Sequence, residues 1–151
     1  TAGYDPNLGV ERTLAPLARR SGQDIRKLET IEQQFRIFAD LPEDMQVAYL
    51  VDGLLELDQQ RDLLRRLVEA WAGGDVDALA RIMIEEELAE TPRIYQALLA
   101  DRNRRWADTL VELMEEEAGA FFIAVGAGHL AGADSVDSLL AQRGLKVERV
   151  Q

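Results

Sequence analysis

The stretch Phe121-Phe-Ile-Ala-Val-Gly126-Ala-Gly128-His129-Leu sets the predicted architecture, because a continuous apolar run ends there in a glycine-flanked turn. A short run of this kind is typical of a buried strand. The side chain that follows such a strand lies at the carboxyl edge of a sheet, where open α/β folds bind ligands. We therefore expect the chemistry of the chain, if it has any, at His129, the only histidine.

The residues after this turn complete a predicted β-α-β unit. A helix is expected to begin at Ala133-Asp134 and to end at Gly144, and the alternating pattern that follows predicts a second strand. With strands near 121–126 and 145–150, the unit has the order and length of a right-handed parallel crossover. His129 would belong to its first loop.

Upstream of this unit the chain is predicted to be mostly helical. A short strand is expected at 23–28, which would place Glu29 at a strand end. Apolar residues recur at helical spacing in several segments bounded by capping residues, proline or glycine: 10–20, 31–39, a long segment from Asp40-Leu-Pro42-Glu43 to Trp71 with a polar interruption at 59–62, 76–83, and 92–113. The predicted fold class is therefore helix-rich α/β, with several helices packed on a small sheet.

Composition sets further limits on function. A chain of 151 residues with 47% hydrophobic and 30% charged residues is expected to form one domain with a real core. The formal net charge of −11 repels phosphate backbones and anionic lipid headgroups, so we expect no nucleic-acid partner. The absence of cysteine excludes disulfides and thiolate metal sites. No stretch approaches the roughly 20 apolar residues of a spanning helix, and none resembles a targeting signal.

Two polar residues stand out in the helix predicted over 92–113. Arg102 and Asn103 occupy positions on its apolar side, because Arg102 is four residues from both Leu98 and Trp106. One interpretation is structural: Arg102 extends to an acidic partner and Asn103 caps a backbone group. The other is a functional site. The glutamate triplets 85–87 and 115–117 are interpreted as solvated faces, since neighbouring residues on a helix cannot converge on one ion.

The glycine turn leaves alternatives open as well. The spacing Gly126-x-Gly128-x-x-x-Gly132, with Glu148 twenty positions after Gly128, resembles a loosened dinucleotide-binding fingerprint. For His129 itself, a neutral imidazole can ligate a transition metal or act as a general base. A structural histidine, hydrogen-bonded within its loop, is the competing interpretation.

Several segments together resemble the TraB/GumN family, which is related to the Tiki metalloproteases, over nearly the whole chain. The carboxyl-terminal segment from Phe121 to Gly132, continued by Gly144-Leu-Lys-Val, is similar to that family's carboxyl-terminal signature. Matching segments occur upstream in the same order: Gly3-Tyr4-Asp5 with Gly9-Val10-Glu11, Leu28-Glu29-Thr30 with Glu32-Gln33, Ala70-Trp71 with Gly74-Asp75, and Arg102-Asn103 with Trp106.

The resemblance implies a site of which this chain holds one half. Relatives in the wider clan carry two Gly-x-x-His motifs, and Gly126-Ala-Gly128-His129 is similar to the second. Because His129 is the only histidine, we expect residues 1–151 to be the carboxyl-terminal portion of a larger domain. The missing amino-terminal portion would supply the other histidine, another acid and further strands. The resemblance also implies a bacterial periplasmic or membrane-associated location.

By resemblance, the chain is predicted to be part of a metal-dependent hydrolase or peptidase-like domain using Mn, Co or Zn, with a peptide as substrate. His129 would bind the metal or act as base, Arg102 would polarise a carbonyl, Asn103 would orient Arg102, and Glu29 would act as base or support. The isolated chain is predicted to be inactive. Two alternatives remain: a non-enzymatic binding or regulatory module for peptides or a polysaccharide pathway, and nucleotide binding through the Gly126-Gly128-Gly132 turn.

Overall fold

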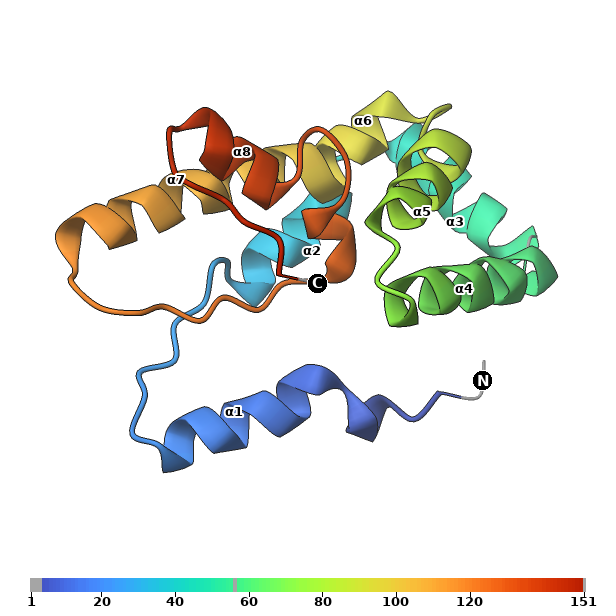
Figure 1. Ribbon diagram of the computed structural model, residues 1–151. Coiled ribbons are helices and arrows are strands. Elements are labelled where there is room, and N and C mark those ends of the chain that lie inside the picture. The colour runs from blue at the N-terminus through green and yellow to red at the C-terminus, as the bar shows by residue number, and fades with distance from the viewer. Residues whose placement is uncertain (1–3, 56, 151) are drawn as a thin grey trace.

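The computed structural model describes residues 4–55 and 57–150, and the regular structure in these ranges is helical (Figure 1). The elements follow one another in this order: η1 (Pro6–Leu8), α1 (Val10–Arg20), α2 (Ile31–Ala39), α3 (Glu43–Leu55), α4 (Leu57–Ala72), α5 (Val76–Ala80), η2 (Arg81–Glu87), α6 (Pro92–Tyr95), η3 (Gln96–Ala100), α7 (Asp101–Glu116), η4 (Ala127–Leu130) and α8 (Val136–Gln142).

The predicted sheet is wrong, because no strand forms within the described ranges. The segments 23–28, 121–126 and 145–150, which were expected to be strands, are neither helical nor paired with one another through their backbones. A strand requires a neighbour for its N–H and C=O groups, whereas an apolar run requires only something to pack against. Leu28 and Val125 find that contact in the core beside Trp106. The helix-rich α/β class and the β-α-β unit are therefore replaced by an all-helical arrangement.

Side-chain caps explain where several of the helices begin. The side chain of Thr30 accepts a hydrogen bond from the backbone N–H of Gln33, and the side-chain oxygen of Gln33 accepts one from the backbone N–H of Thr30, so a capping box begins α2. Asp75 caps α5 by accepting from the backbone of Ala78. Two helices begin at residues other than those predicted. Asp40 ends α2 instead of beginning the next helix, and α8 begins after Ser135, which caps it, rather than at Ala133-Asp134.

Two apolar clusters hold the helices together. The first lies between α4, α5, η2 and the loop around η4, and its buried members are Ala70, Ala78, Leu79, Ile82 and Ala131. The second joins α7 to α8 through Trp106, Leu110 and Val136. The loop that carries His129 links the two clusters, since Ala131 belongs to the first and Val136 to the second. Its position is therefore fixed from both sides.

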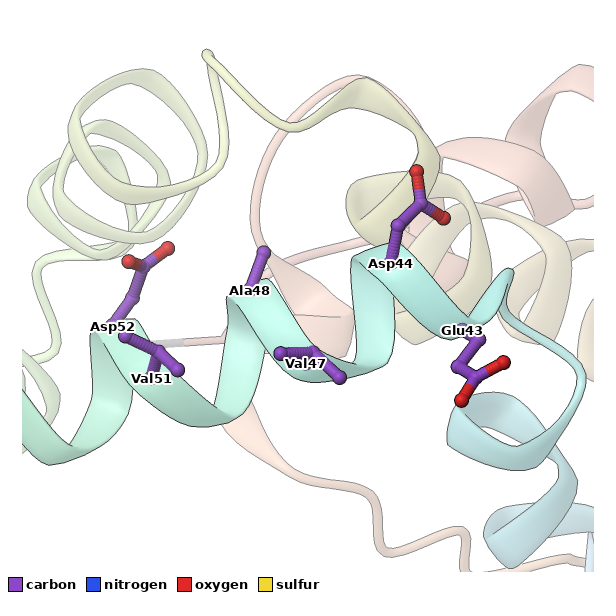
Figure 2. Close-up of a pocket in the computed structure, with 6 residues that line it drawn as sticks. All are labelled: Glu43, Asp44, Val47, Ala48, Val51 and Asp52. Atoms are coloured by element: carbon purple, nitrogen blue, oxygen red, sulfur yellow. The ribbon is translucent and has the colours of Figure 1, made fainter.

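The amino-terminal helices contribute little to these clusters. Neither α1 nor α2 has a fully buried residue, and α1 lies apart from the other helices in Figure 1. Large apolar side chains are exposed along α2 and α3, among them Phe35 and Leu50. Figure 2 shows a hollow along one face of α3, lined by Glu43, Asp44, Val47, Ala48, Val51 and Asp52. Among the described residues, no helix combines the length and apolarity needed to cross a membrane.

The glycines of the histidine loop serve close packing against η2. A Cβ at Gly128 would lie 2.4 Å from Cε of Met83, and one at Gly132 would lie 2.6 Å from Cδ1 of Ile84. Gly132 also has a φ of 81°, in the left-handed region that favours glycine. Contact with η2 thus accounts for the glycines at positions 128 and 132, which are two of the three glycines whose spacing suggested a dinucleotide fingerprint.

We expect Gly132→Ala to lower the free energy of unfolding more than Gly144→Ala does. Both glycines have positive φ, at 81° and 88°, but a Cβ at Gly144 meets no described atom within 4 Å. The φ penalty, about 1–2 kcal/mol, is shared, while Gly132→Ala adds an overpacking cost of about 1 kcal/mol, at the low end because the atom it meets is the end of the Ile84 side chain, which can rotate partly away. Urea unfolding of both variants measures the difference. Equal losses would show that contact with Ile84 does not restrict this loop.

Candidate functional site

The structure brings together four residues that the sequence singled out. Arg102 and Asn103 lie at the beginning of α7, Glu29 lies in the segment before α2, and His129 lies in η4. Asn103 and His129 are buried, with 1% and 8% of their surface exposed. The cluster depends on tertiary packing, because 73 residues separate Glu29 from Arg102 and 26 separate Asn103 from His129.

Glu29 and Arg102 form a two-pronged ion pair. The Nε atom of Arg102 donates to Oε2 of Glu29 at 3.0 Å, and Nη2 donates to Oε1 at 2.6 Å. Nη1 donates to the backbone carbonyl of Leu98 at 2.8 Å. Both side chains are nearly buried, with 12% and 10% exposed. Because both carboxylate oxygens accept from Arg102, Glu29 is held in place and Arg102 is oriented by Glu29, not by Asn103.

Asn103 orients His129 instead. Its Nδ2 donates to the backbone carbonyl of Asp134 at 2.7 Å, and its Oδ1 lies 2.6 Å from Nδ1 of His129. A backbone carbonyl can only accept, so the amide must point its nitrogen at Asp134 and its oxygen at the imidazole. The hydrogen between Oδ1 and Nδ1 therefore belongs to the imidazole. In its neutral form, His129 is protonated on Nδ1 and carries a lone pair on Nε2.

Trp106 completes the site, although the sequence placed it only on the apolar side of its helix and in a segment that resembles the family. It lies one helical turn after Arg102, whose guanidinium carbon is 4.8 Å from the indole centroid. The imidazole of His129 packs on the same residue, with centroids 4.4 Å apart and planes tilted by 48°. The indole Nε1 is buried without a hydrogen-bond partner among the described residues. Trp106 thus joins the ion pair to the histidine through its ring.

Burial and charge keep the imidazole neutral. Burial lowers the pKa of His129, the positive charge of Arg102 lowers it further, and Glu29 partly opposes the change, so that the pKa is about 4. Burial acts to raise the pKa of Glu29, but the hydrogen bonds and charge of Arg102 outweigh it and lower that pKa overall. Near neutral pH the cluster therefore consists of an ionised pair beside an uncharged imidazole.

The loop residues and the neighbouring turn support this arrangement. The backbone N–H of His129 donates to the carbonyl of Gly126 at 2.9 Å, which closes the turn. Gly128 packs on Met83. The sequence did not point to Asp134 as part of the site, because only the folded loop brings its carbonyl to Asn103. A hint was present in the buried amide of Asn103, since such a group needs partners for both its ends.

A metal ion would find one ligand here. The Nε2 atom of His129 makes no hydrogen bond with the residues that the structure describes, whereas both oxygens of Glu29 are engaged by Arg102. In the described ranges, no three His, Asp or Glu side chains lie close enough to hold an ion together. The described residues can supply one ligand to a metal ion, and they do not supply a complete set of ligands.

Comparison with known families agrees with the resemblance of the sequence. The model of the TraB/PrgY/gumN family matches residues 1–149. The chain belongs to the TraB/PrgY/gumN family. No curated protein and no solved structure gives a match to it. In this member of the TraB/PrgY/gumN family, the residues that carried the resemblance at Glu29, Arg102, Asn103 and His129 are those that the fold gathers into one cluster.

Removing one partner of the buried ion pair is expected to destabilise the protein strongly. Glu29→Ala leaves the charge of Arg102 buried and unpaired, and we expect a loss of about 3–5 kcal/mol in the free energy of unfolding. The double variant Glu29→Ala/Arg102→Met should lose less than the sum of the single variants, because no isolated charge remains. Urea unfolding measures all three. Additive losses would contradict a coupled pair, and Arg65→Met, an exposed ion-pair residue, is the matched control.

The imidazole of His129 is expected to titrate with a pKa of about 4, well below its usual value. Since the unfolded chain takes up this proton near pH 6.5, the unfolded state binds more protons than the folded state between about pH 6.5 and 4. The stability contributed by His129 is therefore complete above that window and is lost as the pH falls through it. NMR of the single imidazole gives the pKa directly. His129→Gln should remove this part of the pH dependence, and a titration near 6.5 would refute the burial of a neutral ring.

Proposed function

We propose that the chain carries part of a metal-dependent hydrolase site, in which His129 binds a transition metal through Nε2. The observation that carries this proposal is the hydrogen-bond order Asp134 carbonyl, Asn103 amide, His129 imidazole. It directs the proton to Nδ1 and leaves the opposite nitrogen with its lone pair. Metal-binding histidines almost always donate their other N–H to an oxygen acceptor, as His129 does to Asn103.

The low pKa of the imidazole argues against a general base and is compatible with a metal ligand. A general base works best with a pKa near the operating pH, and the pKa of His129 is about 4. A metal ligand must be unprotonated, and this imidazole is neutral throughout the neutral range. Imidazole nitrogen suits Zn and neighbouring divalent transition metals, so Mn, Co or Zn is the proposed cofactor.

The other residues support the ligand. Arg102 and Glu29 act as a fixed pair that supports the Trp106 ring beneath the imidazole, since three guanidinium nitrogens already donate to protein acceptors. Glu29 is not proposed as the base, because Arg102 occupies both its oxygens. A bound metal would polarise a substrate carbonyl or activate water. The remaining ligands are proposed to come from the amino-terminal portion that the family resemblance implies, with a peptide as substrate.

The first test is metal binding to the chain itself. With ¹⁵N-labelled histidine, Zn²⁺ is expected to shift the Nε2 resonance and to leave Nδ1 protonated, with weak affinity because one protein ligand is available. His129→Ala should abolish the site-specific binding seen by calorimetry, and Asn103→Leu should weaken it by about 10- to 100-fold. Asp44→Asn, which removes an exposed carboxylate on α3, is the control for nonspecific attraction to an acidic protein.

The second test is activity. Protein that includes the amino-terminal portion is expected to hydrolyse peptides in the presence of Mn²⁺, Co²⁺ or Zn²⁺, and to lose that activity on chelation and in His129→Ala. The chain of residues 1–151 alone is expected to be inactive. If Zn²⁺ leaves the His129 resonances unchanged, or if hydrolysis persists in His129→Ala, the metal site is refuted and a non-enzymatic binding module becomes the better interpretation.

A further inference from the structure

A second set of polar contacts lies behind the site, centred on the carboxylate of Asp134. The hydroxyl of Tyr95, at the end of α6, donates to Oδ2 of Asp134 at 2.8 Å. Nη2 of Arg104, on α7, donates to Oδ1 at 3.2 Å. Neither Tyr95 nor Arg104 touches His129 through any described hydrogen bond. Two helices thus hold the side chain of a loop residue whose backbone carbonyl faces the site.

Asp134 therefore makes two kinds of contact, one through its side chain and one through its backbone. Its side chain is fixed by Tyr95 and Arg104, while its carbonyl oxygen accepts from the amide of Asn103. The loop on either side of it is anchored by Ala131 and Val136 in the two apolar clusters. A backbone hydrogen bond of 3.3 Å from Ser135 to Gly132 closes the turn. The contacts of the carboxylate fix Asp134 itself within this anchored loop, and they limit how far its carbonyl can move.

The orientation of the Asn103 amide depends on this carbonyl. If the carbonyl moved away, the amide could rotate and present Nδ2 to the imidazole. Nδ2 is a donor, so Nδ1 of His129 would have to accept, and the proton would move to Nε2. That tautomer has no lone pair at the nitrogen proposed to bind metal. The amide orientation thus determines which nitrogen of His129 is available.

We propose that Tyr95 and Asp134 are positioning residues that select the tautomer of His129. Tyr95 holds the carboxylate of Asp134, the carbonyl of Asp134 holds the amide of Asn103, and the amide places the proton on Nδ1. Arg104 assists from α7 with a longer contact. The tautomer selection stands by itself, and only its use for metal binding rests on the function proposed above.

The contacts around Tyr95 suit this role across the neutral range. Burial, the hydrogen bond to Asp134 and its negative charge raise the pKa of Tyr95 to about 12, with Arg104 opposing. The hydroxyl therefore remains protonated and able to donate throughout the neutral range. Arg104 also pairs with Asp101 on the same helix, at 2.9 Å, so its guanidinium is itself held in position.

A single histidine makes the test direct. In the full chain labelled with ¹⁵N-histidine and free of metal, one imidazole gives the two ring-nitrogen resonances, which distinguish the protonated from the unprotonated nitrogen. The unaltered chain is expected to be protonated at Nδ1. Tyr95→Phe removes one hydroxyl and should shift the tautomer ratio toward Nε2–H about fivefold, as expected for the loss of one ordinary hydrogen bond. Asp134→Ala, which keeps the carbonyl and removes its anchor, should shift it further.

Matched variants distinguish a positioning role from a general loss of stability. Tyr49→Phe removes a hydroxyl from the exposed α3 and should leave the ratio unchanged. Should Tyr95→Phe fail to fold, Arg104→Gln provides a milder change on the exposed side of the same carboxylate, with a smaller shift expected. Folded Tyr95→Phe and Asp134→Ala proteins whose imidazole is unchanged would overturn the proposal.

The tautomer measurement and the Zn²⁺-binding measurement can succeed or fail separately. If the tautomer shifts in these variants but Zn²⁺ does not bind His129 in the unaltered chain, the positioning role stands and the proposed hydrolase site fails. If Zn²⁺ binds His129 in the unaltered chain and binds equally well in Asp134→Ala with an unchanged tautomer, the hydrolase site stands and the positioning role fails.

Discussion

The amide of Asn103 is the contact on which the arrangement of the site depends. It lies on α7, is almost completely buried, and uses its nitrogen for the Asp134 carbonyl and its oxygen for His129. A buried amide left with an unpaired end costs about 1–3 kcal/mol. The helix and the histidine loop are therefore held in one relative position, and that position also fixes the chemical form of the imidazole.

The helical part of the fold could be predicted because its signals are local. The capping box at Thr30, the cap at Asp75 and the proline after Thr91 each act within a few residues. The strands could not be predicted because pairing is not local. The run 121–125 has strand composition, yet Val125 packs beside Trp106 and Phe122 is 79% exposed without a neighbouring strand. A short apolar run does not by itself indicate a sheet.

How far each site residue could be predicted from the sequence depends on whether its side chain is out of place in the local pattern. Arg102 and Asn103 stood out because polar groups on an apolar helix face need partners, and the fold supplies these as Glu29 and His129. Glu29 was suggested by the family resemblance and a strand that does not form. Trp106 and Asp134 were missed, since one looked like an ordinary core residue and the other acts through its backbone. Backbone acceptors leave no mark on a sequence.

Burial and ion pairing together set the charges of the cluster. Glu29 and Arg102 nearly cancel each other, because their charges are 2.6 Å apart. Their effects on the pKa of His129 oppose one another, and burial is the largest cause of its low basicity. An imidazole placed here is neutral mainly because it is enclosed, and the positive charge of Arg102 adds to this effect while Glu29 opposes it. Substituting the pair would therefore change the packing around Trp106 more than the charge of His129. The ion pair and the Asn103 amide thus have separate roles. Arg102 packs on the Trp106 ring that contacts the imidazole, and the amide determines which imidazole nitrogen carries the proton.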